Sequence, residues 1–191
     1  MNRRQALHKT SWILKSTLFA PSLLSAIQAC RPQVESDNDL QVLDVAQNKL
    51  VTAIADTIIP RTDTPGASDV KVHRFLDVLL KDVFEEEVKE KFLSGLSEFN
   101  QECQSATGSD FIDLSAGDRG TYLTPLDREV MGQSYEKEVP FYYTFKHLMT
   151  TIYFSSEQGA KQNLNYRPVP GPYEGDIAYH PGDKITIGNH M

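Results

Sequence analysis

His73, Asp77 and His147 are the side chains in this sequence that come nearest to forming a metal site. His73 and Asp77 stand four residues apart, so on a helix both could reach one ion, but zinc needs three or four ligands. The same spacing also describes an ordinary side-chain pair on a helix face. His147 lies in an apolar segment, where a hydrogen-bonded core histidine is expected. A metal-dependent enzyme using all three residues is therefore one hypothesis.

Other catalytic patterns are missing from the sequence. It has no HExxH, GxSxG, Walker A or GxGxxG motif, so no zinc-protease helix, nucleophile elbow or phosphate-binding loop is indicated. The two cysteines, Cys30 and Cys103, form no CxxC pair, which argues against a thioredoxin-type site, a c-type haem or a cysteine-ligated cluster. Cys103 is expected to be a semi-buried thiol on a helix. The net charge of −7 argues against nucleic acid as a partner.

The N-terminal segment, residues 1–29, is typical of an export signal. Arg3 and Arg4 form a twin-arginine (Tat) pair, and residues 16–29 carry no charge but are too short to span a membrane comfortably. The segment "AIQAC" resembles a bacterial lipobox, although Gln28 is an unusual residue there, and it predicts lipidation at Cys30. We expect a Tat-type lipoprotein signal over residues 1–29 and a linker over 30–39. An N-terminal amphipathic helix that stays on the protein is the alternative.

The rest of the chain is strongly acidic. Removal of the signal would leave 15 basic and 26 acidic residues, which fits an acidic body on a lipid tether better than binding to an anionic membrane face.

Apolar residues at spacings of three and four predict a mainly α-helical bundle in a domain spanning residues 40–191. We expect Ser68 to cap the second helix and Gly108 to end the third. Ser115 should cap one short helix and Thr124 another, with Pro125 at the first helical position. The helix near His147 should be central in the core. The expected helices cover residues 40–59, 68–83, 86–105, two short stretches after Ser115 and Thr124, and 140–154.

The chain from about residue 155 changes character, with four prolines and five glycines over residues 155–190. This composition excludes a regular helix there and predicts an extended strap rich in Pro, Gly and Tyr. The strap would lie on the protein's own surface or on a partner. Free disorder of residues 172–191 is the alternative.

The loop "PRTDTPGAS" joins the first two predicted helices. Pro60 should end one helix, Pro65 and Gly66 suit the middle of a type II turn, and the side chains of Asp63 and the threonines can bond the loop's own amides. This favours a structural joint, with direct contact to a larger partner as the alternative.

Two segments together resemble the gluconate 2-dehydrogenase subunit 3 family, over about residues 40–180. The first, "ADTIIPRTDTPGASDVKVHRFLD", departs from the pattern at Lys71. The second, around "YFSSEQG" and the Pro-Gly strap, lacks the usual glycine before Tyr153 and has Phe154 in place of a tyrosine. The matching residues that we single out, as structural or partner-docking positions, are Asp56, Pro60, Thr62, Asp63, Pro65, Gly66, Phe75, Asp77, Tyr153, Ser156, Glu157, Gly159, Pro170 and Gly171.

The resemblance implies a non-catalytic small subunit of a periplasmic, membrane-associated dehydrogenase of sugars or sugar acids. Its partner would be a large FAD-dependent flavoprotein of the glucose–methanol–choline type, often with a cytochrome c subunit that carries haem. The small subunit would bring that partner through the Tat translocase and stabilise it. The family supplies no catalytic or cofactor-binding residues for this chain. A stand-alone lipoprotein that binds a sugar or another ligand, supported by the aromatic residues of the strap, is the alternative.

Overall fold

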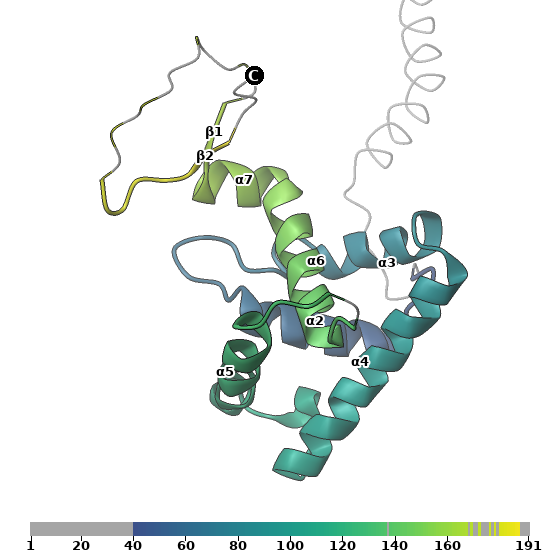
Figure 1. Ribbon diagram of the computed structural model, residues 1–191. Coiled ribbons are helices and arrows are strands. Elements are labelled where there is room, and N and C mark those ends of the chain that lie inside the picture. The colour runs from purple at the N-terminus through teal and green to yellow at the C-terminus, as the bar shows by residue number, and fades with distance from the viewer. Residues whose placement is uncertain are drawn as a thin grey trace, which may run out of the picture. The chain divides into compact units, whose positions relative to one another are not determined.

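A computed structural model describes residues 40–136, 138–167, 169, 172, 176, 178 and 180–187, and contacts within the chain divide it at Asp39–Leu40. The expectation of a mainly helical fold is confirmed over these residues (Figure 1). They form six α-helices, one short 3-10 helix and two strands of two residues each. In chain order these are α2 (Val45–Ile58), α3 (Val72–Asp82), α4 (Glu86–Thr107), η2 (Phe111–Asp113), α5 (Ala116–Met131), α6 (Phe141–Ser155), α7 (Glu157–Asn163), β1 (Asn165–Tyr166) and β2 (Thr186–Ile187).

Helix α2 begins five residues later than its apolar pattern predicted. Asp44 caps it through a reciprocal arrangement in which the Gln47 amide donates to Asp44 Oδ1 and the Asp44 amide donates to Gln47 Oε1. The residues just before it are bound by α3 instead of continuing the helix. A strong cap therefore decides the boundary that periodicity alone placed too early.

Helix α6 is central, as its composition predicted, and it contacts α2, α3, α4, α5 and α7 (Figure 1). Five of its side chains are buried, namely Tyr142, Phe145, Met149, Ile152 and Tyr153. The prediction that His147 belongs to the core is wrong. His147 is exposed, and its ring lies 4.4 Å from the ring of Tyr143 on the same helix.

Helix α4 lies against α6 through a cluster of aromatic rings. The ring of Phe92 lies 5.3 Å from that of Phe141, and Phe141 also covers Gly95, where a Cβ atom would come within 2.5 Å of its ring. Gly95 therefore lets this helix approach α6 closely. The predicted end of the helix at Gly108 is confirmed, because Gly108 adopts φ +81°, which suits a residue without a Cβ.

Two predicted short helices after Ser115 are a single helix, α5. Ser115 caps it as predicted, accepting a hydrogen bond from the Asp118 amide at 3.2 Å. The predicted cap at Thr124 is wrong, since its hydroxyl bonds backward to the Gly120 carbonyl at 2.7 Å and Pro125 lies inside the helix. Pro125 forgoes one backbone hydrogen bond, and the helix nevertheless continues to Met131.

The start of α3 also differs from prediction. Ser68 was expected to cap it, but residues 67–71 form turns, and Lys71 stands before the helix with φ 56° and no side-chain cap. The Ser68 carbonyl accepts a hydrogen bond from the Lys71 amide at 3.0 Å, and the Ala67 carbonyl accepts one from the Val72 amide at 3.1 Å. These turns delay the helix by one turn.

The expectation that no regular helix follows residue 155 is wrong, because α7 covers Glu157–Asn163. Ser156 joins it to α6: its hydroxyl donates to the Tyr153 carbonyl at 2.6 Å and accepts from the Gly159 amide at 3.0 Å. Gly159 packs so closely that a Cβ atom there would lie 2.0 Å from the Tyr153 carbonyl oxygen.

Beyond α7, two distant parts of the C-terminal segment meet. Strands β1 and β2 pair in parallel, with Asn165 opposite Thr186, and the Lys184 ammonium donates to the Gln162 carbonyl at 2.6 Å. The segment "HPGDK" forms a turn, in which the Asp183 amide donates to the His180 carbonyl at 3.0 Å and Gly182 has φ +100°. None of the helices among the described residues is long and apolar enough to cross a bilayer.

The contact at Gly159 gives a direct test of how α7 is held. Gly159→Ala should destabilise the protein by about 3 kcal/mol, because the backbone carbonyl of Tyr153 cannot move away without opening the α6–α7 junction. Gly120→Ala is the matched control: Gly120 is also helical and has no neighbour within 4 Å of an added Cβ, so this change should stabilise by about 0.5–1 kcal/mol. Urea denaturation of both variants measures the difference, and equal effects would contradict the described junction.

Candidate functional site

The loop between α2 and α3 is held by carboxylates from both of its sides. Asp56 in α2 accepts a hydrogen bond from the Ser68 amide at 2.9 Å, and Asp69 accepts one from the Gly66 amide at 2.8 Å. Asp69 also pairs with the exposed guanidinium of Arg61 at 3.1 Å. The loop is closed on itself by the Ala67 amide, which donates to the Ile59 carbonyl at 3.0 Å. Acceptors on both sides of the bend fix its path.

The predicted type II turn at Pro65–Gly66 is wrong. Such a turn needs a positive φ at its second central residue, and Gly66 does not have one. A glycine is required there for another reason, since a Cβ atom at this position would lie 2.8 Å from the backbone nitrogen of Arg61. The loop folds back on its own backbone, which leaves no room for a side chain.

The threonines of the loop interact as expected, but Asp63 does not have the predicted role. The Thr64 amide lies 3.4 Å from the Thr62 hydroxyl, whereas the loop amides that bind a carboxylate bind Asp56 and Asp69. Pro60, Thr62 and Asp63 are all exposed. These residues form the outer surface of the loop, where another molecule could contact them.

Tyr153 joins the loop to the other matching segment, 88 residues away in sequence. Its ring is buried in α6, its hydroxyl donates to the Pro65 carbonyl at 2.6 Å, and the same hydroxyl accepts from the Asn163 side-chain amide at 3.0 Å. One phenol therefore connects α6, α7 and the loop. The structure thus brings together Asp56, Pro65, Gly66, Tyr153, Ser156 and Gly159, which the sequence places in two separate motifs.

Asp77 has a structural partner that the sequence did not indicate. Its side chain is 2 % exposed, and its carboxylate accepts hydrogen bonds from the amides of Gln41, Val42 and Leu43 at 2.6, 3.0 and 2.8 Å. These bonds replace water around a buried charge, which would otherwise be costly. The metal hypothesis fails here, because Asp77 is occupied by backbone amides and His147 is exposed on another helix. Residues 40–136, 138–167 and the described positions after them contain no group of three potential ligands.

The remaining predicted positions do not join this cluster. Phe75 is exposed on α3, and Glu157 pairs with Lys161 on the surface of α7 at 2.6 Å. This pairing lowers the pKa of Glu157 and raises that of Lys161, mainly through the hydrogen bond between them. Arg3, Arg4, Cys30, Pro170 and Gly171 lie outside the described residues.

Sequence reasoning missed a polar cluster between α5 and α6. Asp127 Oδ1 accepts hydrogen bonds from the Tyr142 hydroxyl at 3.0 Å and from the Lys146 ammonium. The cluster borders a hollow of about 200 Å³ that Thr57, Ile58 and Leu123 also line. Tyr142 and Lys146 stand four residues apart on α6, which was a detectable signal, but only the fold supplies Asp127. The Lys146–Asp127 pair joins α6 to α5 at the edge of the core.

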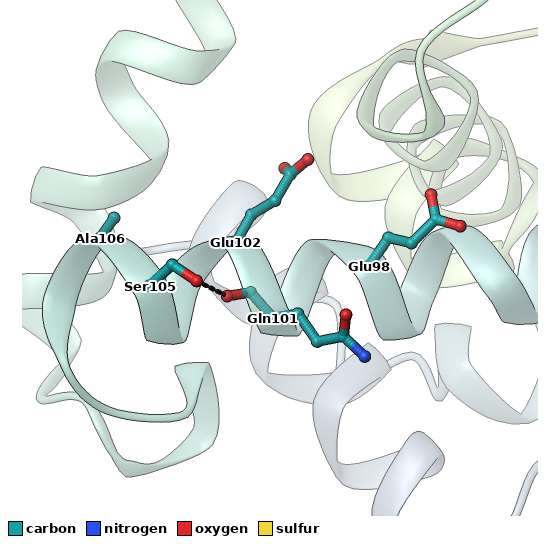
Figure 2. A pocket seen from close by; sticks show the side chains of 5 residues that line it. All are labelled: Glu98, Gln101, Glu102, Ser105 and Ala106. Atoms are coloured by element: carbon teal, nitrogen blue, oxygen red, sulfur yellow. Dashed lines mark hydrogen bonds between the residues drawn. The ribbon is translucent and has the colours of Figure 1, made fainter.

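Two further hollows lie on the surface of the domain. One, of about 570 Å³, is lined by Glu98, Gln101, Glu102, Ser105 and Ala106, all on α4, where the Ser105 hydroxyl donates to the Gln101 carbonyl (Figure 2). A surface supplied by one helix has no opposing wall to enclose a ligand. A second hollow, of about 530 Å³, lies where α6, α7 and β1 meet and includes Phe154, Leu164 and Tyr166.

Cys103 offers no reactive thiol in this fold. Its side chain is fully buried, and burial raises its pKa, which keeps the thiol neutral and poorly nucleophilic.

These contacts show the class of protein to which the chain belongs. It is a small helical domain whose buried polar groups hold its own loops and helix junctions in place. The chain belongs to the gluconate 2-dehydrogenase subunit 3 family, whose model matches residues 45–171. It is thus a small subunit of a dehydrogenase complex, and the family name implies association with other gluconate 2-dehydrogenase subunits. Comparisons with curated proteins and with solved structures gave no match.

Removing the Tyr153 hydroxyl should loosen the loop selectively. Tyr153→Phe leaves the Pro65 carbonyl and the Asn163 amide without their partner, so hydrogen exchange at the Gly66, Ala67 and Ser68 amides should accelerate about tenfold. Tyr142→Phe is the control, because it deletes a buried hydroxyl that is bonded to Asp127 and not to the loop. Equal acceleration in both variants would mean that the hydroxyl contributes only to global stability.

Two tyrosines predict a loss of stability in alkali. Burial raises the pKa of Tyr122 to about 12 and also raises that of Tyr142, with the Asp127 charge adding to the shift of Tyr142. The folded state therefore keeps protons that the unfolded chain releases from about pH 10, and the free energy of unfolding should fall as pH rises from 10 toward 12. Urea denaturation across this pH range measures the slope, which Tyr122→Phe should make shallower. An unchanged slope would contradict the assignment.

Proposed function

We propose that this chain is the non-catalytic small subunit of a periplasmic, membrane-associated, FAD-dependent dehydrogenase of sugars or sugar acids. FAD would reside in a large subunit of the glucose–methanol–choline type, and haem in a cytochrome c subunit. The family match carries this proposal. It is supported by the structural roles of the residues that meet at Tyr153, which stabilise a loop and a helix junction.

The proposed route to the periplasm uses the Tat translocase. Arg3 and Arg4 would direct export, Cys30 would carry the lipid anchor, and a folded, FAD-loaded partner could travel with this chain. The proposal assigns assembly, export and stabilisation of the large subunit to this chain, and it places the complex on the periplasmic side of a bacterial membrane.

We propose that the surface beyond α7 contacts the large subunit. Tyr166, Val169 and Ile185 expose 48, 81 and 71 % of their area there. Tyr166 also lines the hollow that contains Phe154 and Leu164. Exposed apolar groups gathered beside a hollow are typical of protein-binding surfaces. The Asn165 amide donates to the Ile185 carbonyl at 2.9 Å, so Ile185 lies beside the start of β1.

Purification of the tagged full chain from membranes of its own host tests the proposal. A large partner should co-purify and show the visible absorbance of an oxidised flavin. Val169→Ser combined with Ile185→Ser should reduce its recovery at least fivefold, whereas Val88→Ser, an exposed valine on α4, should not. Recovery of the wild-type chain alone, without a flavoprotein, would overturn the proposed function.

A further inference from the structure

The side of α6 that the other helices leave uncovered has no charged residue. The exposed residues of this helix are Thr144, His147, Thr151, Phe154 and Ser155, and none of them is Asp, Glu, Lys or Arg. The first four follow one another at spacings of three, four and three residues, so they lie along one side of the helix. We call these four residues the α6 outer face.

Every other α-helix in the described part of the chain exposes charge. Where α6 does carry a charged side chain, at Lys146, that side chain pairs with Asp127 on α5 and is half-buried. In a chain of which 24% is charged, an uncharged exposed face is unusual, and the centres of protein interfaces are depleted of charge in the same way. Exposed charged residues of the other helices include Lys49 on α2, Lys81 on α3, Glu98 on α4, Arg128 on α5 and Lys161 on α7.

Aromatic rings extend the α6 outer face at both ends. The His147 ring lies 4.4 Å from the Tyr143 ring, which lies 5.4 Å from the ring of Tyr135 in the connection before the helix. At the other end Phe154 is 41 % exposed and lines the hollow that also contains Tyr166. Aromatic side chains are enriched where proteins bind each other. The α6 outer face is therefore continuous, through Phe154, with the surface beyond α7.

The area that a stable complex needs also favours a surface of this extent. A stable interface buries about 800 Å² on each partner and takes about 20–30 residues from it. Tyr166, Val169 and Ile185, with the hollow beside them, supply fewer residues than that. Because family membership implies association with other subunits, a stable contact beyond α7 has to extend onto a neighbouring surface. The neighbouring surface that is uncharged and aromatic is the α6 outer face.

We propose that the large flavoprotein subunit covers the α6 outer face and the surface beyond α7 as one continuous interface. The inference rests on the proposed function, which supplies this partner. The part of the large subunit that meets α6 is uncharged, because a charge buried against Thr151 and Phe154 would lose its water without gaining a counter-ion. The hydroxyls of Thr144 and Thr151 can accept hydrogen bonds from that surface without adding charge.

A charge placed on the α6 outer face tests this interface in the tagged full chain, purified from membranes. Thr151→Glu should reduce recovery of the flavoprotein at least tenfold, whereas Thr151→Val, which keeps the face uncharged, should retain it. Ser97→Glu, at an exposed position of α4, is the matched control and should bind the flavoprotein like the wild type. Thr144→Glu is a second variant whose acid lies in the first turn of α6, where the helix dipole favours it. An unchanged urea midpoint shows that a variant is folded.

Photocrosslinking identifies the molecule that covers this face. Benzoylphenylalanine replaces His147 in one full chain and Ser97 in another. We expect a crosslink from position 147 to the flavin-containing subunit and none from position 97. A crosslink from position 147 only to a second copy of this chain or to lipid would overturn the inference. Equal recovery of the flavoprotein by Thr151→Glu, Thr144→Glu and Ser97→Glu would overturn it too, and would leave the proposed function standing. A wild-type chain that recovers no flavoprotein would overturn both.

Discussion

The hydrogen bond from the Tyr153 hydroxyl to the Pro65 carbonyl is the contact on which the arrangement of this domain depends most. It joins the loop after α2 to the end of α6, and its second bond, from Asn163, adds α7. Around it, local hydrogen bonds hold each element in place. Asp56 and Asp69 accept bonds from amides of the loop, and Ser156 accepts one between α6 and α7. The Tyr153 hydroxyl therefore adds a polar link between these local contacts to the packing of the common core. Asp56, Pro65, Gly66, Tyr153, Ser156 and Gly159, which come from two distant segments of the sequence, thus act as one structural unit.

The sequence was informative where a side chain determines its own local geometry. The apolar stripe and first-turn acids of α4, its glycine stop at Gly108 and the cap at Ser115 were all predictable, because each acts within one turn of its position. Predictions failed where a local rule was overruled by neighbours. Pro125 and Thr124 indicated a helix start, yet the helix passes through them, and α7 was missed because the composition of the long segment concealed seven helical residues.

The central contacts could not be predicted from spacing. Tyr153 and Pro65 are 88 residues apart, and Asp77 reaches the amide of Leu43, 34 residues before it. From the sequence alone, a buried carboxylate that binds backbone amides cannot be distinguished from one that binds a metal. Gly66 shows the same difficulty: a glycine was correctly expected to matter, but the fold requires the absence of a side chain there and not a positive φ.

The pairing of β1 with β2 has a consequence for how this family can vary. Because Asn165 and Thr186 are held side by side, the two ends of the chain between Tyr166 and Thr186 are fixed next to each other. The entropy cost of closing such a loop grows only with the logarithm of its length, by about 0.6 kcal/mol for each doubling. Residues can therefore be added to or removed from this loop with little effect on the helices beneath it. The length of this loop can therefore change to fit the surface that the loop contacts, while the Tyr153 junction stays the same.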